Sequence, residues 1–374
     1  ILAGIEIIKS LTPDIDADAL GGNIDFQLSK APHTGFKSQL RLQGGYNNLR
    51  DDFGNYEATY TFSDRFLNNK LGLIVAGHIE RNQRGYDSFR ALWEIPREKR
   101  INEKFAPMRA AQVDLAYTLT DRKKYGFNAL LDLNIPNGSL YLTSFFSSRS
   151  DKSSVQNVNY YLKDVTIGRH LISSESEISI GSFSIGGKHL LFDLINFDWG
   201  GSLSNSRSAL PFSNSYGFIQ PDAYYSENLP QFPTADDIIN APARDLSGFY
   251  ANSFYRTSSI TKDHINSFQL NFEVPFSYSK NLSGKIKFGA KTNINQKERD
   301  NSSLYRSMYN YTNKNYVKYH SGYGKPGFKF DFVQSNGAPS ILNYLDLSFN
   351  AGKFLNGEYL FPIGISEYEL NYLM

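Results

Sequence analysis

The feature of this sequence that most constrains its fold is a strict alternation of apolar and polar side chains over segments of roughly ten residues. In Phe268–Phe276, apolar side chains fill every second position and mostly polar ones lie between them. Leu71–Ile79 and Tyr125–Leu133 show a similar alternation. Because successive side chains of a β-strand point to opposite faces, each segment predicts a strand with one apolar and one polar face. About 9–11 residues suffice for a tilted strand to cross a bilayer, so these segments fit membrane-spanning strands.

The same pattern predicts nine strands whose links alternate in length, except that Asn47–Phe53 is short where a long link is expected. The expected strands cover residues 37–46, 54–62, 70–81, 123–134, 139–149, 171–184, 188–204, 265–277 and 284–297. Short links are expected at Asn47–Phe53, Ser63–Asn69, Ile135–Gly138, Ile185–Gly187 and Ser279–Ser283. Long links are expected at Asn82–Asp121, Asp151–His170, Asn205–His264 and after Asp300. Gln112–Thr118 also has strand character, and we place it inside the first long link so that long and short links still alternate.

Alternating link lengths favour a membrane barrel over a soluble sandwich. Tight turns at one rim and long loops at the other are typical of transmembrane barrels. Packed soluble domains rarely contain several loops longer than about 15 residues. Aromatic residues make up 15% of the chain, which suits strands and the aromatic girdles at membrane interfaces. The sequence therefore predicts an all-β fold, part of a transmembrane antiparallel β-barrel.

The N-terminal run Ile5–Pro32, "IEIIKSLTPDIDADALGGNIDFQLSKAP", has a different organisation. Two short strands, Ile5–Ser10 and Asn23–Leu28, flank an acidic stretch and a glycine pair that allows a sharp turn. In order, spacing and position before a β-rich remainder, this run resembles the end of the plug domain of TonB-dependent outer-membrane receptors. The residues that carry the plug motif are Pro13, Asp14, Asp16, Asp18, Gly21 and Gly22. Lys124–Phe146 also resembles the barrels of such receptors from Bacteroidetes-type bacteria.

The resemblance implies that residues 1–33 end a plug domain and residues 34–374 form the N-terminal part of an outer-membrane barrel with long extracellular loops. A plugged barrel has about 22 strands, so the chain would be a fragment, with the segment that contacts TonB upstream of Ile1. Ser340–Met374 would lie in an outer loop or begin a strand near Glu367–Leu373.

The function implied by the resemblance is energy-coupled uptake of a scarce nutrient across the outer membrane of a Gram-negative cell. The nutrient could be a ferric siderophore, cobalamin or an oligosaccharide. The implied partners are the TonB energy-transducing complex, outer-membrane lipid and that ligand. No enzyme activity and no cofactor are expected. The alternatives are a passive porin-like outer-membrane channel and an all-β surface protein that binds glycans.

Several other kinds of site are disfavoured by the residues themselves. Asp14, Asp16 and Asp18 have the spacing of a calcium loop, but Ala19 stands where that loop needs glycine; an acidic surface turn is the alternative. Gly322–Gly327 matches a dinucleotide fingerprint but follows no clear strand. The six histidines show no metal-ligand spacing, and a net charge of +2 gives no reason to expect nucleic acid as a partner. Hydrolase, zinc-protease and P-loop motifs are absent from the sequence.

The long links are rich in aromatic residues with cations nearby, a composition suited to stacking against sugars or aromatic chelators and to pairing with acidic groups. The candidate ligand contacts are Tyr216, Tyr224, Tyr225, Tyr305, Arg306 and Tyr309. Packing of the loops against one another is the alternative role for each of them.

The alternation also predicts which way the side chains face. We expect Phe268, Leu270, Phe272, Val274 and Phe276 to face lipid, and Gln269, Asn271 and Glu273 to face the lumen. Residues 1–30 are expected inside the barrel, because their strands are too short to cross a bilayer. We expect those strands to pair with further plug strands.

Overall fold

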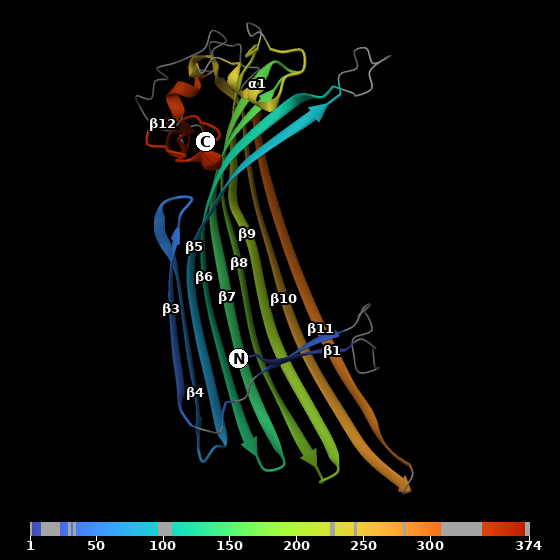
Figure 1. Cartoon of the computed structure of the whole chain (residues 1–374). Coiled ribbons are helices and arrows are strands. Elements are labelled where there is room, and N and C mark those ends of the chain that lie inside the picture. Colours follow the sequence, from blue (N-terminus) through green and yellow to red (C-terminus); the bar gives the residue numbers. More distant parts are fainter. Residues whose placement is uncertain are drawn as a thin grey trace, which may run out of the picture.

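The structure is a computed structural model that describes residues 2–8, 23–28, 31–32, 35–95, 107–224, 229–242, 245–279, 282–307 and 339–370. Within these residues a nine-stranded antiparallel sheet dominates, accompanied by two small two-stranded sheets and a few short helices (Figure 1). The prediction of an all-β, partial β-barrel fold is confirmed.

Each strand of the large sheet lies beside its neighbours in the sequence, so the sheet is a simple antiparallel meander. The number and order of the strands match the prediction. Their bounds are β3 Lys37–Asn47, β4 Asp52–Phe66, β5 Leu71–Glu94, β6 Arg109–Ile135, β7 Gly138–Tyr161, β8 Thr166–Leu191, β9 Ile195–Gln220, β10 Tyr250–Ser279 and β11 Leu282–Ser307.

Most of the predicted long links are strand extensions, which corrects the sequence analysis. β5 continues to Glu94 and β6 begins at Arg109, so Gln112–Thr118 belongs to β6 rather than to a loop. Most of Asp151–His170, apart from a turn at residues 162–165, and about half of Asn205–His264 are likewise strand. Alternation is interrupted where these extensions begin, because both faces carry polar groups there. Of the run Asp121–Lys124, for example, Arg122 and Lys124 make ion pairs on one face and Asp121 makes one on the other.

The predicted turn at Ile185–Gly187 is also wrong, because these residues lie inside β8. The turn is at residues 192–194, where Phe192 and Asp193 adopt positive φ angles of 53°. The glycines that suggested a turn instead allow close approach of neighbouring side chains. A Cβ at Gly186 would lie 2.3 Å from the Tyr141 hydroxyl oxygen, and one at Gly187 would lie 2.8 Å from the Trp199 indole nitrogen.

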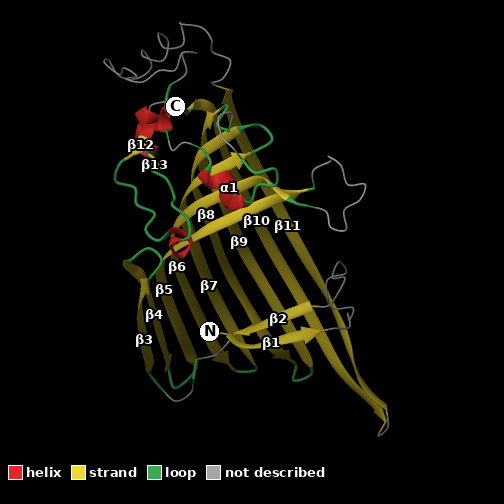
Figure 2. Ribbon diagram, turned by 45° about the horizontal axis from the view of Figure 1, so that its top comes forward, coloured by secondary structure: helices red, strands yellow, loops and turns green. Residues whose placement is uncertain are grey.

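The N-terminal strands β1, Leu2–Ile8, and β2, Asn23–Leu28, form a separate antiparallel pair and are not part of the large sheet. Within the described residues they pair with each other, and pairing with further plug strands stays a prediction. The hairpin crosses in front of the lower part of the large sheet in both views (Figures 1 and 2). Pro13, Asp14, Asp16, Asp18, Gly21 and Gly22 lie outside the described residues, and the assignment of residues 1–33 to a plug stays a prediction.

Short elements gather beside the upper end of the sheet (Figure 2). They are α1 Ala235–Asn240, η1 Leu246–Gly248, η2 Ile341–Tyr344, β12 Leu345–Asp346, η3 Phe354–Gly357, β13 Gly364–Ile365 and α3 Glu367–Leu370. A reciprocal capping box between Thr234 and Asp237 begins α1. The alternative prediction of a strand near Glu367–Leu373 is wrong, because Glu367–Leu370 is helical. None of the helices described is both long enough and apolar enough to cross a membrane.

The two faces of the large sheet differ in character. Residues directly opposite each other in an antiparallel pair share a face, so the register assigns every strand position to one of two faces. The apolar face carries Phe268, Leu270 and Phe272, with Phe268 47% exposed, and its pairs continue through Gly201 and Ile185 to Leu142, Leu131 and Leu73. The polar face carries Gln269, Asn271 and Glu273. The division agrees with the predicted alternation of these residues, and contact with lipid stays a prediction.

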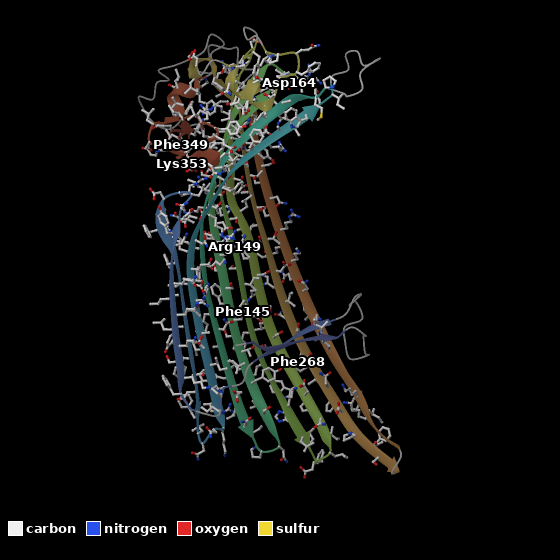
Figure 3. All side chains as sticks on the ribbon, in the orientation of Figure 1. Phe145, Arg149, Asp164, Phe268, Phe349 and Lys353 are labelled. Atoms are coloured by element: carbon white, nitrogen blue, oxygen red, sulfur yellow. The ribbon has the colours of Figure 1, made fainter. Side chains whose placement is uncertain are left out.

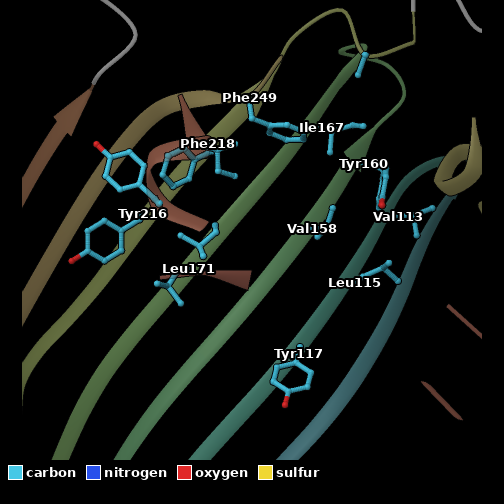
Figure 4. Close-up of a cluster of buried hydrophobic side chains, with 14 of the residues drawn as sticks. Val113, Leu115, Tyr117, Val158, Tyr160, Ile167, Leu171, Tyr216, Phe218 and Phe249 are labelled. Atoms are coloured by element: carbon cyan, nitrogen blue, oxygen red, sulfur yellow. The ribbon is translucent and has the colours of Figure 1, made fainter. Parts of the chain in front are cut away.

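The largest core lies on the upper part of the apolar face (Figure 4). There, Val113, Leu115 and Tyr117 of β6 continue, without a bulge, the face that carries Tyr125 and Phe127 lower down. Their partners in the core include side chains of residues 339–370, a segment that we call the strap. In β9 a register shift near Pro211 moves Tyr216 and Phe218 onto this face, as a β-bulge does.

Candidate functional site

The polar face is the first candidate site, because ion pairs follow it from strand to strand. Lys124 lies 3.0 Å from Glu80, and the Arg122 guanidinium holds both oxygens of Asp151 at 2.7 and 2.8 Å. Arg149 is on the same face of β7, above Phe145 (Figure 3). Paired and partly exposed charges of this kind suit a wall that faces water rather than a packed core.

One ion pair on the polar face is buried and also holds the backbone. Arg65 of β4 and Asp132 of β6 are 2.6 Å apart, with side chains only 1% and 7% exposed. The Arg65 Nη1 atom donates to the carbonyl oxygen of Ala31 at 2.8 Å, and the Ala31 N–H points to Asp132 at 3.4 Å. The chain that comes from β2 is therefore fixed to the sheet at Ala31.

Between these charges, the polar face of β8 and β9 is lined by small hydroxyl side chains. Ser204 donates to Ser182 at 2.9 Å, and Thr143 of β7 is hydrogen-bonded to Ser184. β11 again carries charged side chains on this face. Lys285 pairs with Glu273 at 3.2 Å, and Lys297 pairs with Asp263 at 3.7 Å. The arrangement offers hydrogen bonds and weak, solvent-exposed ion pairs to a polar solute.

Among the predicted ligand contacts that are described, Tyr216 and Tyr224 lie apart from Tyr305. Tyr216 and Tyr224 are buried in the large core, where the Tyr224 hydroxyl donates to the Ile238 carbonyl oxygen at 3.0 Å. Burial favours the packing role for these two tyrosines. Tyr305 is 64% exposed and lies directly opposite Tyr255 on the polar face of β10 and β11, and Arg306 follows it in β11. Tyr225 and Tyr309 lie outside the described residues.

Metal chemistry gains no support from the part of the chain that is described. No group of three or more histidine, aspartate or glutamate residues there could hold a metal ion. The described histidines contact ordinary neighbours, as His189 does in accepting a hydrogen bond from Trp199 at 3.1 Å. The possible calcium loop at Asp14, Asp16 and Asp18 and the glycine-rich Gly322–Gly327 lie outside the described residues.

The strap forms the second candidate site, on the opposite face of the sheet. The Gln156 side chain makes two hydrogen bonds to the backbone of Ile365, at 2.8 and 3.1 Å, as a neighbouring strand would. Arg169 donates to the Ile363 carbonyl oxygen at 2.7 Å, and Ser173 donates to Glu367 at 2.5 Å. Side chains of β7 and β8 thus hold the backbone of Ile363 and Ile365 and the side chain of Glu367 at the start of α3.

Arg169 of β8 is a buried, charged residue in the contact between the sheet and the strap. It is only 2% exposed, and its Nη1 atom has no hydrogen-bond partner among the described residues. Burial lowers the pKa of its guanidinium to about 10, which still leaves it protonated at neutral pH. A buried cation of this kind is costly unless its remaining donors are satisfied.

Replacing Gln156 with leucine should loosen the strap. The change keeps the approximate volume but leaves the buried N–H and C=O groups of Ile365 without partners, which costs about 1–3 kcal/mol for each such group. Hydrogen exchange at Ile365 should accelerate while exchange in the lower half of β7 stays unchanged. The matched control is Asn157→Leu, the next residue on the other face, which should leave Ile365 protected. Equal exchange in the two variants would contradict the assignment.

At the upper edge of the lower apolar face, aromatic side chains are followed directly by an ion pair. Tyr125 and Phe146 pack at 5.8 Å between ring centroids, and immediately above them Arg81 pairs with Asp121 at 2.9 Å. Below this line, β6 presents Tyr125, Phe127, Ala129, Leu131 and Leu133 over nine positions, close to the length that a tilted membrane-spanning strand needs. Aromatic residues at the edge of an apolar band are typical of membrane interfaces.

Comparisons with known proteins add little to these observations. No family model matches the chain, and no curated protein matches it. Among solved structures, the chain was aligned with the Pseudomonas aeruginosa outer-membrane protein OccK2 (OpdF), crystallised in complex with glucuronate. The alignment has 8% sequence identity and a TM-score of 0.08, and it covers 73% of this chain and 95% of that one. A similarity at this level carries no argument, and the fold class rests on the strands themselves.

Proposed function

We propose that this chain is part of a TonB-dependent outer-membrane receptor that takes up a scarce nutrient. The proposal rests on the combination of two features. One face of the sheet carries an apolar band, and the other face holds a separate N-terminal unit, by which we mean β1, β2 and the chain that follows them to Ala31. The band ends at the Arg81–Asp121 pair, and the N-terminal unit joins the polar face at Ala31. A lipid-facing exterior and an occupied interior are what a gated barrel requires.

The proposed mechanism involves binding and movement, without covalent chemistry. Ligand binds at the outer end of the barrel, and the energy-transducing partner then acts on the N-terminal unit to open the lumen. Tyr255 and Tyr305 offer two adjacent aromatic rings on the polar face near that end, which supports a sugar or an aromatic chelator as ligand. The small hydroxyl side chains of β8 and β9 leave room for a polar solute below them.

A passive porin-like channel is the second candidate, and the ion pairs on the polar face favour it. Side chains such as Lys285 and Lys297 are well exposed and suit a water-filled lumen. The discriminating experiment measures the conductance of the full-length protein in planar bilayers, with and without its N-terminal unit, and uptake in a strain that lacks TonB. The receptor should be nearly closed when intact, open when truncated, and inactive in uptake without TonB. Open conductance of the intact protein, or uptake that survives loss of TonB, would favour the passive channel.

The proposal also predicts the topology of the turns. The tight turns near Asn137 and Asp193 lie at one end of the sheet, and residues 221–224 and α1 lie at the other (Figure 1). An epitope inserted after Gln231 should be labelled by antibody on intact cells. The same epitope inserted after Asn137 should be labelled only after the outer membrane is permeabilised. Labelling at Asn137 on intact cells would contradict the assignment.

A further inference from the structure

The buried contact at Ala31 joins three separate parts of the chain. Arg65 is next to the last residue of β4, Asp132 is near the end of β6, and Ala31 lies between β2 and β3. The Arg65 guanidinium uses Nη2 for Asp132, Nη1 for the Ala31 carbonyl oxygen and Nε for the Asn69 carbonyl oxygen at 3.0 Å. Each of its nitrogens therefore has an acceptor, which fixes the guanidinium plane.

The sheet leaves room for this contact by placing a glycine beneath it. Gly72 lies in β5 between the two charged strands, opposite Asp132 in the register. A Cβ at Gly72 would lie 2.4 Å from Asp132 Oδ1 and 2.9 Å from both Arg65 Nη1 and Ala31 Cβ. Any side chain at this position would therefore displace the ion pair or Ala31.

Ala31 is 2% exposed and packs against Ile74 and Leu130, which are both buried on the polar face. Elsewhere on that face the ion pairs remain partly exposed, as Arg122 and Asp151 do at 19% and 12%. The strongest point of attachment described on the polar face is therefore the one that holds the incoming chain, rather than one that joins neighbouring strands.

We infer that Arg65 and Asp132 form a clamp that anchors the N-terminal unit to the barrel wall, so that movement of the residues before Ala31 ends at this point. A pull on the N-terminal unit would extend or displace the chain upstream of Ala31 while β3 and its neighbours keep their register. Charge-assisted hydrogen bonds in a buried site are stronger than those of exposed pairs. Under such a pull, the clamp is therefore the last contact between the N-terminal unit and the barrel wall to break. The mechanical consequence rests on the proposed function, but the anchor itself does not.

The test is hydrogen exchange at the Ala31 amide in the folded full-length protein. Two variants disrupt the clamp in different ways. Asp132→Asn removes the charge, and Gly72→Ala keeps every charged group but inserts a methyl group beneath the pair. Either change should accelerate exchange at Ala31 by about tenfold or more, since one charged hydrogen bond is lost or distorted. The matched control is Arg122→Gln, which breaks the Arg122–Asp151 pair on the same face without touching Ala31.

Selective acceleration at Ala31 in Asp132→Asn and Gly72→Ala, with Arg122→Gln like the wild type, supports the clamp. Unchanged exchange at Ala31 in both variants overturns it. Acceleration of similar size throughout β3–β6 in all three variants also overturns it, since the pair would then only stabilise the sheet. Planar-bilayer conductance of the same variants separates this inference from the proposed function. A wild-type protein that is already open would refute gated transport and leave the exchange result standing.

Discussion

Replacing Phe218 with alanine is expected to lower the free energy of unfolding by about 3–5 kcal/mol, the range found for large aromatic side chains in cores. Phe218 is 2% exposed on the apolar face of β9, and its ring centroid lies 5.6 Å from that of Tyr344 in the strap. The cost combines lost burial with a cavity that the surrounding strands cannot close, because the backbone of a sheet holds them apart.

Denaturant unfolding of the protein reconstituted in lipid vesicles would measure this effect. The control is Phe53→Ala, since Phe53 is 81% exposed at the start of β4 and its loss should change stability by less than about 0.5 kcal/mol. Limited proteolysis provides a second readout, because a cavity beneath Tyr344 should expose the strap first. A cost similar to that of Phe53→Ala would show that the core at Phe218 is not formed in the membrane.

Replacing Phe272 with arginine is expected to cost about 2–4 kcal/mol, as charged residues do at the lipid-facing midplane of a barrel. Phe272 is at the centre of the apolar positions of β10, and its ring stacks between Phe197 at 4.8 Å and Phe288 at 5.1 Å. The arginine would lose both ring contacts and place its charge in hydrocarbon.

The neighbouring substitution Asn271→Arg supplies the control. Asn271 is adjacent in the sequence but on the polar face, opposite Gly289, where a charge can reach water. Its effect on refolding into vesicles should be small. Equal costs for the two substitutions would contradict the assignment of the faces, and a larger cost for Asn271→Arg would reverse it.

The strand order could be predicted from the sequence because lipid and lumen impose opposite demands on alternate residues. In Phe268–Phe276 apolar and polar side chains alternate strictly, and the strand was located correctly. Directly above the apolar band the alternation is interrupted. Asp121–Lys124 is a run of four charged residues that resembles a loop, although alternate members face opposite sides of a continuous strand. An interruption of the alternation therefore marks where a strand leaves the apolar band, and not where the strand ends.

The candidate sites were less predictable, because each depends on residues that are distant in sequence. Nothing near Arg65 indicates Asp132 or Ala31, and Gln156 gives no hint that it binds the backbone of Ile365, 209 residues away. The aromatic loop residues were recognised, but their sequence pattern does not distinguish Tyr216, which is buried, from Tyr305, which is exposed. Burial depends on the strap, whose position only the fold defines.

The unequal lengths of β4 and β5 have a consequence for how the sheet could grow. β4 stops pairing with β5 at Arg81, so among the described residues the upper part of β5 has β6 on one side and no strand on the other. An unpaired edge of this kind invites another strand, from the same chain or from a different molecule. Here Asn55 accepts the Gln83 N–H at 2.6 Å and Asn47 donates to the Gln83 carbonyl oxygen at 3.2 Å. Further up, Arg50 and the backbone of Leu355 occupy the two oxygens of Asp87. At Gln83 the backbone edge of β5 is thus already occupied by the side chains of Asn47 and Asn55, which opposes the addition of another strand at that point.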